Sequence, residues 1–123
     1  MTEKSPLIYI EHILESIKLI QEYLGDCNKK QLSENHMMYD AILRNLQTLS
    51  ESVQKIPDEI KKDYPQITWK DIAGFRNILV HNYLEGIDCD IIWVITKNEL
   101  PKLQLVMDSM KTQLSTHNGM ILP

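Results

Sequence analysis

Three side chains suited to phosphodiester chemistry follow one another closely in the segment from Trp69 to Tyr83. Arg76, His81 and Tyr83 have the spacing Arg-x4-His-x-Tyr. Cleaving RNA without a metal requires a base for the 2′-hydroxyl, an acid for the leaving 5′-oxygen and positive charge over the phosphate. Histidine titrates near neutrality and can act as base or acid, and arginine offers a planar fork of donors matched to phosphate oxygens. Arg76 and His81 are therefore the candidate catalytic residues.

The spacing of these residues raises a geometric question. Five residues of α-helix rotate a side chain by about 500°, which leaves Arg76 and His81 roughly 140° apart around the axis. Asn77 shares a face with His81, and Tyr83 shares a face with Arg76. One straight helix therefore does not bring Arg76 and His81 to one point. Either the helix ends near His81, or two copies cross so that each chain supplies part of a shared pocket.

The apolar pattern of the segment favours the crossing of two copies. The apolar residues from Ile72 to Val80 point in nearly every direction around a helix, and such a helix is buried on all sides. Gly74 costs about 1 kcal/mol relative to alanine in a helix, and a close helix approach would explain its presence. We expect one side of this helix to meet the core and another to meet a partner chain, which predicts a homodimer.

Helical periodicity also organises the rest of the chain. The first helix is predicted to begin at Ser5-Pro6, a cap followed by proline at the first helical position, and to end at Gly25. A second helix is predicted from about Ser33 to Val53, with Met37 and Ala41 broadening its core stripe. That stripe consists of Met38, Ile42, Leu46, Leu49 and Val53.

The second half of the chain continues the helical pattern. Pro57 opens a short helical segment that Tyr64-Pro65 closes. Asp88 is a plausible cap for the last region, whose apolar residues from Ile92 to Leu114 keep one phase through Pro101; this predicts one helix kinked at the proline or two collinear helices. Residues 116–123 are predicted to be a frayed tail. We expect one all-α domain over residues 1–123, a bundle of four to five helices.

Composition limits the classes of function. The 123 residues carry a net charge of −4 and 43% hydrophobic residues, with no apolar run of transmembrane length and no signal-peptide h-region. A cytoplasmic protein is expected. The acidic balance argues against a module that coats nucleic acid, including DNA, by broad phosphate contacts, but allows a small cationic pocket. Two cysteines, Cys27 and Cys89, are too few for a disulfide scaffold or a four-ligand zinc site.

No cofactor or metal is predicted. Glu85, Asp88 and Asp90 are carboxylates at a junction between a loop and a helix, where caps and solvated charges are the usual role. Cys89 has no nearby histidine with which to form a nucleophilic pair. The three histidines outside the motif stand without ligand-spaced partners.

The segment around the motif resembles the HEPN-domain ribonucleases, in particular the HepT toxins. This resemblance covers about a third of the chain closely, and the second helix departs from the family's Gly-Glu-Ala step at Leu49-Ser50-Glu51-Ser52. The residues that carry it are Trp69, Ile72, Gly74-Phe75-Arg76-Asn77, Leu79-Val80-His81-Asn82-Tyr83, Gly86-Ile87-Asp88, Ile92-Trp93 and Leu100-Pro101.

The resemblance implies a HEPN-type bundle that dimerises around this helix. It implies that Arg76 and His81 are the ribonuclease residues, that Asn77 orients one of them, and that Tyr83 is the position where a partner nucleotidyltransferase antitoxin, similar to MntA, attaches AMP. The function implied is the toxin of a type VII-like toxin–antitoxin pair, a metal-independent endoribonuclease acting on tRNA or mRNA. Two alternatives stay open: a non-catalytic nucleotide- or substrate-binding subunit of a two-chain nucleotidyltransferase, and a helical adaptor without a site.

Overall fold

The fold is an all-α bundle, seen here in a computed structural model that describes residues 5–85 and 88–121. The side chains of Arg76, Val80, residues 82–85 and residues 116–121 lie outside that description. Helices make up the regular structure of the described residues, which confirms the predicted fold class. Among these helices, none combines the length and the apolar character needed to cross a lipid bilayer. The helices are α1 (Pro6–Leu24), α2 (Lys29–Glu34), α3 (His36–Lys55), α4 (Asp58–Lys61), α5 (Trp69–Glu85), α6 (Cys89–Val94), the π-helical segment η1 (Ile95–Glu99) and α7 (Leu100–Ile121).

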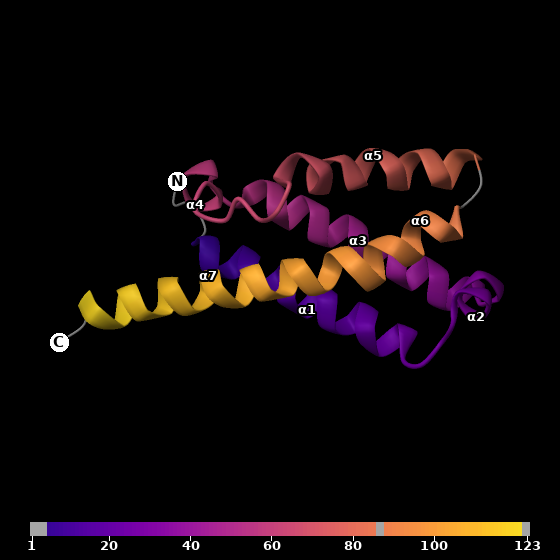
Figure 1. The fold of residues 1–123 in the computed structure, drawn as a ribbon, viewed down its shortest axis with the longest axis horizontal. Coiled ribbons are helices and arrows are strands. Elements are labelled where there is room, and N and C mark those ends of the chain that lie inside the picture. Colours follow the sequence, from indigo (N-terminus) through magenta and orange to yellow (C-terminus); the bar gives the residue numbers. More distant parts are fainter. Residues whose placement is uncertain (1–4, 86–87, 122–123) are drawn as a thin grey trace.

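Helices α1 and α3 form the closed centre of the bundle. They pack along each other, with α7 along α1 and α5 along α3 (Figure 1). The predicted start and end of α1 are confirmed: Ser5 Oγ accepts a hydrogen bond from Leu7 N at 3.2 Å, and Gly25 ends the helix with a φ of 51°. Residues completely removed from solvent fill the centre, among them Ile10, Ile13, Ile20, Ile42, Leu46 and Leu49.

Two predictions about the second helix need correction. The chain forms two helices here, because Asn35 lies between α2 and α3 and its side chain accepts a hydrogen bond from Met38 N at 3.0 Å. Asparagine caps a new helix more favourably than it continues an old one. Met37, placed in the first turn of α3, is 85% exposed and does not broaden the core. The departure at Leu49–Ser52 packs well, since Ser50 is buried and its hydroxyl donates to the Leu46 carbonyl at 2.8 Å.

The last region is one continuous rod that contains a π-helical turn before Pro101. Leu100 N donates to the Ile95 carbonyl, five residues back, and both side chains are buried. The longer turn therefore places Leu100 in the core and leaves Glu99 exposed, although a regular 3.6-residue period would have put Glu99 in phase with Ile95. The rod runs to Ile121, so residues 116–121 of the predicted tail are helical; residues 122–123 lie outside the description.

Candidate active site

Helix α5 carries the whole candidate motif without a break. It runs from Trp69 to Glu85, four residues beyond His81. The possibility that the helix ends near His81 is therefore wrong. Regular helix geometry keeps Arg76 and His81 roughly 140° apart around the axis. On a single copy of α5, the two positions therefore lie on different sides of the helix.

One face of α5 is open to solvent. Ala73, Asn77 and His81 recur at intervals of four residues, and all three are exposed. A Cβ atom added to the neighbouring Gly74 would meet no atom within 4 Å. Burial on all sides was expected from the sequence, but in one chain it is confined to the side against α3. The close approach expected at Gly74 is not made by the part of the chain that the structure describes.

The buried side of α5 consists of Ile72, Phe75 and Leu79, which are 5–7% exposed. These positions have the spacing i, i+3, i+7 of a helical stripe. Because the stripe packs on α3, it fixes the rotation of α5 and thereby turns Asn77 and His81 outward. The structure brings those two predicted residues onto one face. The backbones of Arg76 and Tyr83 are helical, and their side chains lie outside the described set.

Trp69 anchors the beginning of α5. Its indole Nε1 donates to the carbonyl oxygens of Lys61 and Tyr64, both at 3.2 Å, and Lys61 Nζ lies 5.6 Å from the centre of the ring. The Tyr64 hydroxyl in turn donates to Gln113 on α7. Trp69 belongs to the segment that resembles the family, and its contacts attach the start of α5 to the segment before it.

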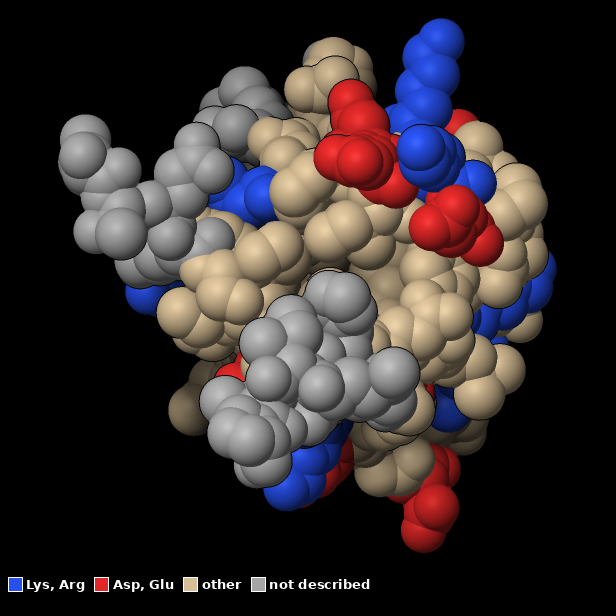
Figure 2. Space-filling model, turned by 90° about the vertical axis from the view of Figure 1, so that its left-hand side faces the viewer, with Lys and Arg blue, Asp and Glu red and all other residues tan. Residues whose placement is uncertain are grey.

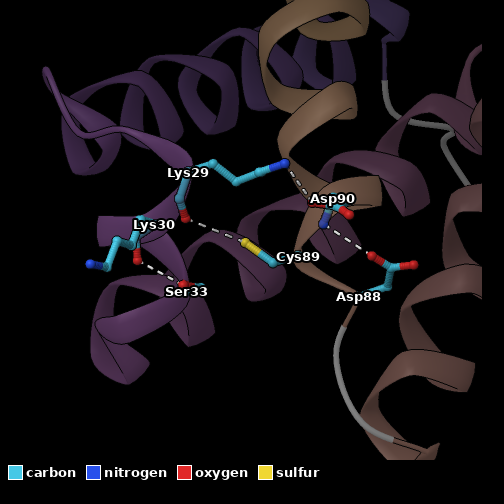
Figure 3. A network of polar contacts seen from close by, with 6 residues as sticks. All are labelled: Lys29, Lys30, Ser33, Asp88, Cys89 and Asp90. Carbon is cyan, nitrogen blue, oxygen red and sulfur yellow. Dashed lines mark hydrogen bonds and ion pairs between the residues drawn. The ribbon is translucent and has the colours of Figure 1, made fainter.

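Figure 3 shows the corner where α2 meets the beginning of α6, just after the motif. Lys29 Nζ lies 2.8 Å from Asp90 Oδ1, and the Cys89 thiol donates to the Lys29 carbonyl with an Sγ–O distance of 3.8 Å. Asp88 caps α6 as predicted, because its carboxylate accepts a hydrogen bond from Asp90 N at 3.0 Å. These contacts join the beginning of α6 to α2.

Sequence reasoning missed this corner, and the reason is the separation along the chain. Lys29 and Asp90 belong to different helices, and nothing in either local pattern pairs them. Burial raises the pKa of the Cys89 thiol, which favours its protonated form. Tyr39 is buried nearby, and burial raises its pKa as well. Within the described residues its hydroxyl has no hydrogen-bond partner.

Among the described residues, the charged side chains form neither a metal-binding group nor, on the face seen in Figure 2, a broad basic surface. In residues 5–85 and 88–121, no group of three histidine, cysteine or carboxylate side chains is arranged to hold a metal ion. Figure 2 shows the end of the molecule on which α4 lies, where lysine, arginine and carboxylate groups alternate at the margin of an uncharged surface. The described part of this face carries no extended patch of one sign.

Comparison with known proteins places the motif in a family. Residues 13–110 match the family model described as "Ribonuclease HepT-like". A Methanocaldococcus jannaschii protein named "Gamma-glutamylcyclotransferase and putative RNase" is 36% identical over 101 residues, which are 82% of this chain and 45% of that protein; the chain thus spans under half of that relative's length.

Two further relatives are covered over most of their length. A "Putative RNase" of the same organism is 31% identical over 104 residues, 85% of this chain and 94% of that protein. A "Probable ribonuclease HepT" of Thermococcus cleftensis is 32% identical over 97 residues, 78% of this chain and 86% of that protein. No solved structure matches the chain significantly. The extent of the family match and of these alignments shows that the chain belongs to the HepT-like family of HEPN ribonucleases.

Proposed function

We propose that this protein is the toxin of a toxin–antitoxin pair, a metal-independent endoribonuclease that cleaves tRNA or mRNA in the cytoplasm. Its active site forms where the α5 helices of two copies cross. Arg76 and His81 are the catalytic residues and Asn77 supports them. The proposal rests on family membership together with the geometry of α5.

The observation that carries the composite site is the unbroken course of α5 past His81. Because the helix continues to Glu85, Arg76 and His81 of one chain diverge. The exposed face formed by Ala73, Asn77 and His81 has room above Gly74 for a second helix. A two-fold contact through Ala73 and Asn77 would set each Arg76, about 60° from Ala73 around the helix, at the edge of the contact and beside the partner's motif.

The proposed reaction is an internal transfer at phosphorus. His81 removes the proton from the 2′-hydroxyl, and the 2′-oxygen bonds to phosphorus while the bond to the 5′-oxygen breaks. The leaving 5′-oxygen takes a proton, which leaves a 2′,3′-cyclic phosphate and a 5′-hydroxyl. Arg76 neutralises the charge that gathers on the phosphoryl oxygens, and Asn77, one turn before His81, is placed to orient the imidazole.

Removal of either catalytic side chain tests the proposal. His81→Ala and Arg76→Ala should each lower the rate of RNA cleavage by roughly a hundredfold to ten-thousandfold, with an unchanged circular-dichroism melting curve. His12→Ala, a change at an exposed histidine on α1, is the matched control and should cleave normally. Cleavage should persist in EDTA. An active His81→Ala protein, or activity lost to the chelator, would contradict the assignment.

Tyr83 is the proposed point of control by a cognate nucleotidyltransferase antitoxin. It lies seven residues after Arg76, on the same face of α5. AMP attached to its hydroxyl brings a phosphate that competes with RNA for the arginine and an adenosine that blocks the pocket.

Intact-mass spectrometry tests this control. Incubation with the nucleotidyltransferase and ATP should add AMP-sized masses and silence cleavage, whereas Tyr83→Phe should keep cleavage and gain no mass. AMP additions that persist in Tyr83→Phe would move the modification elsewhere. A protein that binds ATP but cleaves no RNA would favour the role of a nucleotide-binding subunit.

A further inference from the structure

A long groove separates α5 from the rod formed by α6, η1 and the beginning of α7. It has a volume of about 550 Å³ and is lined along α5 from its first turn to Ile78 and along the rod from Asp90 to Lys102. At 1.5 Å per residue, the α5 wall from Asp71 to Ile78 is roughly 11 Å long and the rod wall from Asp90 to Lys102 is roughly 18 Å long, which matches two to three turns of a helix. Figure 1 shows the two walls close together near the α5–α6 turn and diverging from there. We call this feature the α5–α6 groove.

The floor and walls of the groove are apolar and partly open to solvent. Ile91 is 38% exposed and Val94 is 49% exposed, which are high values for residues of this size and type. Leu105, one turn beyond Lys102, is 72% exposed and extends the apolar surface along the rod. The apolar lining residues are Ile72, Phe75, Ile78, Ile91, Val94 and Ile95, with Ile67 at the end of the groove.

The charges at the groove favour a cationic occupant. Its ionisable lining groups are Asp71 on α5, Asp90 on α6, Glu99 on η1 and Lys102 on α7. The ion pair formed among the described residues joins Asp90 to Lys29, so Asp71 and Glu99 lie on opposite walls without a cationic partner within 4 Å. With Asp90 paired to Lys29, two carboxylates remain against one lysine, and this balance disfavours phosphate and hence RNA as the occupant.

The groove lies on a different side of α5 from the candidate active site. Phe75 and Ile78 line the groove, whereas Asn77 and His81 lie on the exposed face. Asn77 is separated from Phe75, in the middle of the α5 wall, by about 160° around the helix axis, whereas Ile78, at the end of that wall, lies about 60° from His81. A dimer formed through Ala73 and Asn77 therefore leaves the part of the groove around Phe75 accessible to a different molecule.

We propose that the α5–α6 groove docks a helical segment of a partner protein, with apolar side chains on one face of that helix and Lys or Arg at its margins. The segment inserts its apolar face between α5 and the rod, and its cations pair with Asp71 and Glu99. The length, apolar floor and opposed carboxylates of the groove match this ligand. The occupant would contact the helix that carries Asn77 and His81 from its other side. This proposal does not depend on ribonuclease activity.

A synthetic amphipathic peptide of about 18 residues, long enough to populate a helix in water, provides the probe. It carries leucine at helical spacing and lysine at both margins, and a matched peptide carries glutamate in place of lysine. Fluorescence anisotropy should show binding of the lysine peptide and not of the glutamate peptide. Val94→Lys should weaken binding on the order of tenfold, and Asp71→Asn with Glu99→Gln should weaken it severalfold.

The matched control changes charge away from the groove. Glu15→Gln with Glu22→Gln removes two exposed carboxylates from α1 and should leave peptide binding unchanged. If this control weakens peptide binding as much as the groove variants do, the binding reflects general attraction of a cationic peptide to an acidic protein, and the proposal is overturned. Absence of binding by the lysine peptide would overturn it as well. A shift of Val94→Lys to a different oligomeric state without peptide would assign the groove to the contact between copies instead.

Discussion

Helices α1 and α3 bury their apolar faces within one chain, whereas α5 keeps one face exposed. Ile13, Ile42 and Leu46 are completely buried. On α5 the stripe against α3 is buried, but Ala73 and Asn77 are exposed and Gly74 faces empty space. The bundle of one chain therefore covers only part of the surface of α5, and the rest is able to contact another surface. The closed pair supplies stability, and we propose that the open helix supplies contact with other molecules.

The largest expected effect concerns the open face of α5. Gly74→Arg adds a long charged side chain where the single chain has room, so the protomer should fold normally. The dimer should dissociate in sedimentation experiments, and cleavage should fall by roughly a hundredfold, the scale of losing one catalytic group. Glu15→Arg, on the exposed face of α1, is the control. A dimeric, active Gly74→Arg protein would show that α5 is not the contact between copies.

A change in the closed pair of α1 and α3 should lower the stability of the fold, whereas a change on the open side of α5 should affect it little. Leu46→Ala leaves a cavity at a fully buried position of α3 and should lower the free energy of unfolding by about 2–5 kcal/mol. Ile78→Ala, at a half-buried position of the α5–α6 groove, should cost less than about 1.5 kcal/mol. Urea denaturation measures both. Equal losses would mean that α5 is as tightly packed as α3.

A smaller effect is expected where α5 is attached to the preceding loop. Trp69→Phe keeps an aromatic ring and removes the indole donor to the Lys61 and Tyr64 carbonyls. The loss should be about 1 kcal/mol in the free energy of unfolding. Trp93→Phe is a fitting control, because Trp93 is also partly buried and its ring faces Lys97. No difference between the two variants would show that the indole hydrogen bonds do not fix the start of α5.

The smallest effect is expected at the α2–α6 corner. Lys29→Met removes a solvent-exposed ion pair with Asp90, and such pairs contribute little to stability. The melting temperature should stay within experimental error of the wild-type value. A clear fall in melting temperature would show that this ion pair, and not the packing beneath it, holds α6 against α2.

The predictable parts of the fold are those determined by local periodicity. The 3.6-residue period predicts a buried stripe that includes Ile42, Leu46 and Leu49, and all three are completely buried. The break at Asn35 was missed because a polar residue on a helix surface and a cap look alike in sequence. The π-helical turn that buries Leu100 was also missed, since it shifts the period by one residue.

The shared face of Asn77 and His81 follows from their four-residue spacing. The continuation of α5 past His81 does not, because the sequence also allowed the helix to end there. The corner formed by Lys29 and Asp90 depends on residues that are distant in sequence, which leave no local signal. The α5–α6 groove likewise depends on how two helices diverge, and each helix separately looks like ordinary core.

The central claim is that Arg76 of one chain acts with His81 of the other. The direct measurement is RNA cleavage by a hybrid dimer of one Arg76→Ala chain and one His81→Ala chain, purified through two different affinity tags. Both parent homodimers should be inactive. The hybrid retains both catalytic side chains in one of its two sites and should recover roughly half of the wild-type rate. A hybrid as inactive as its parents would contradict the claim and place both residues in a site built by a single chain.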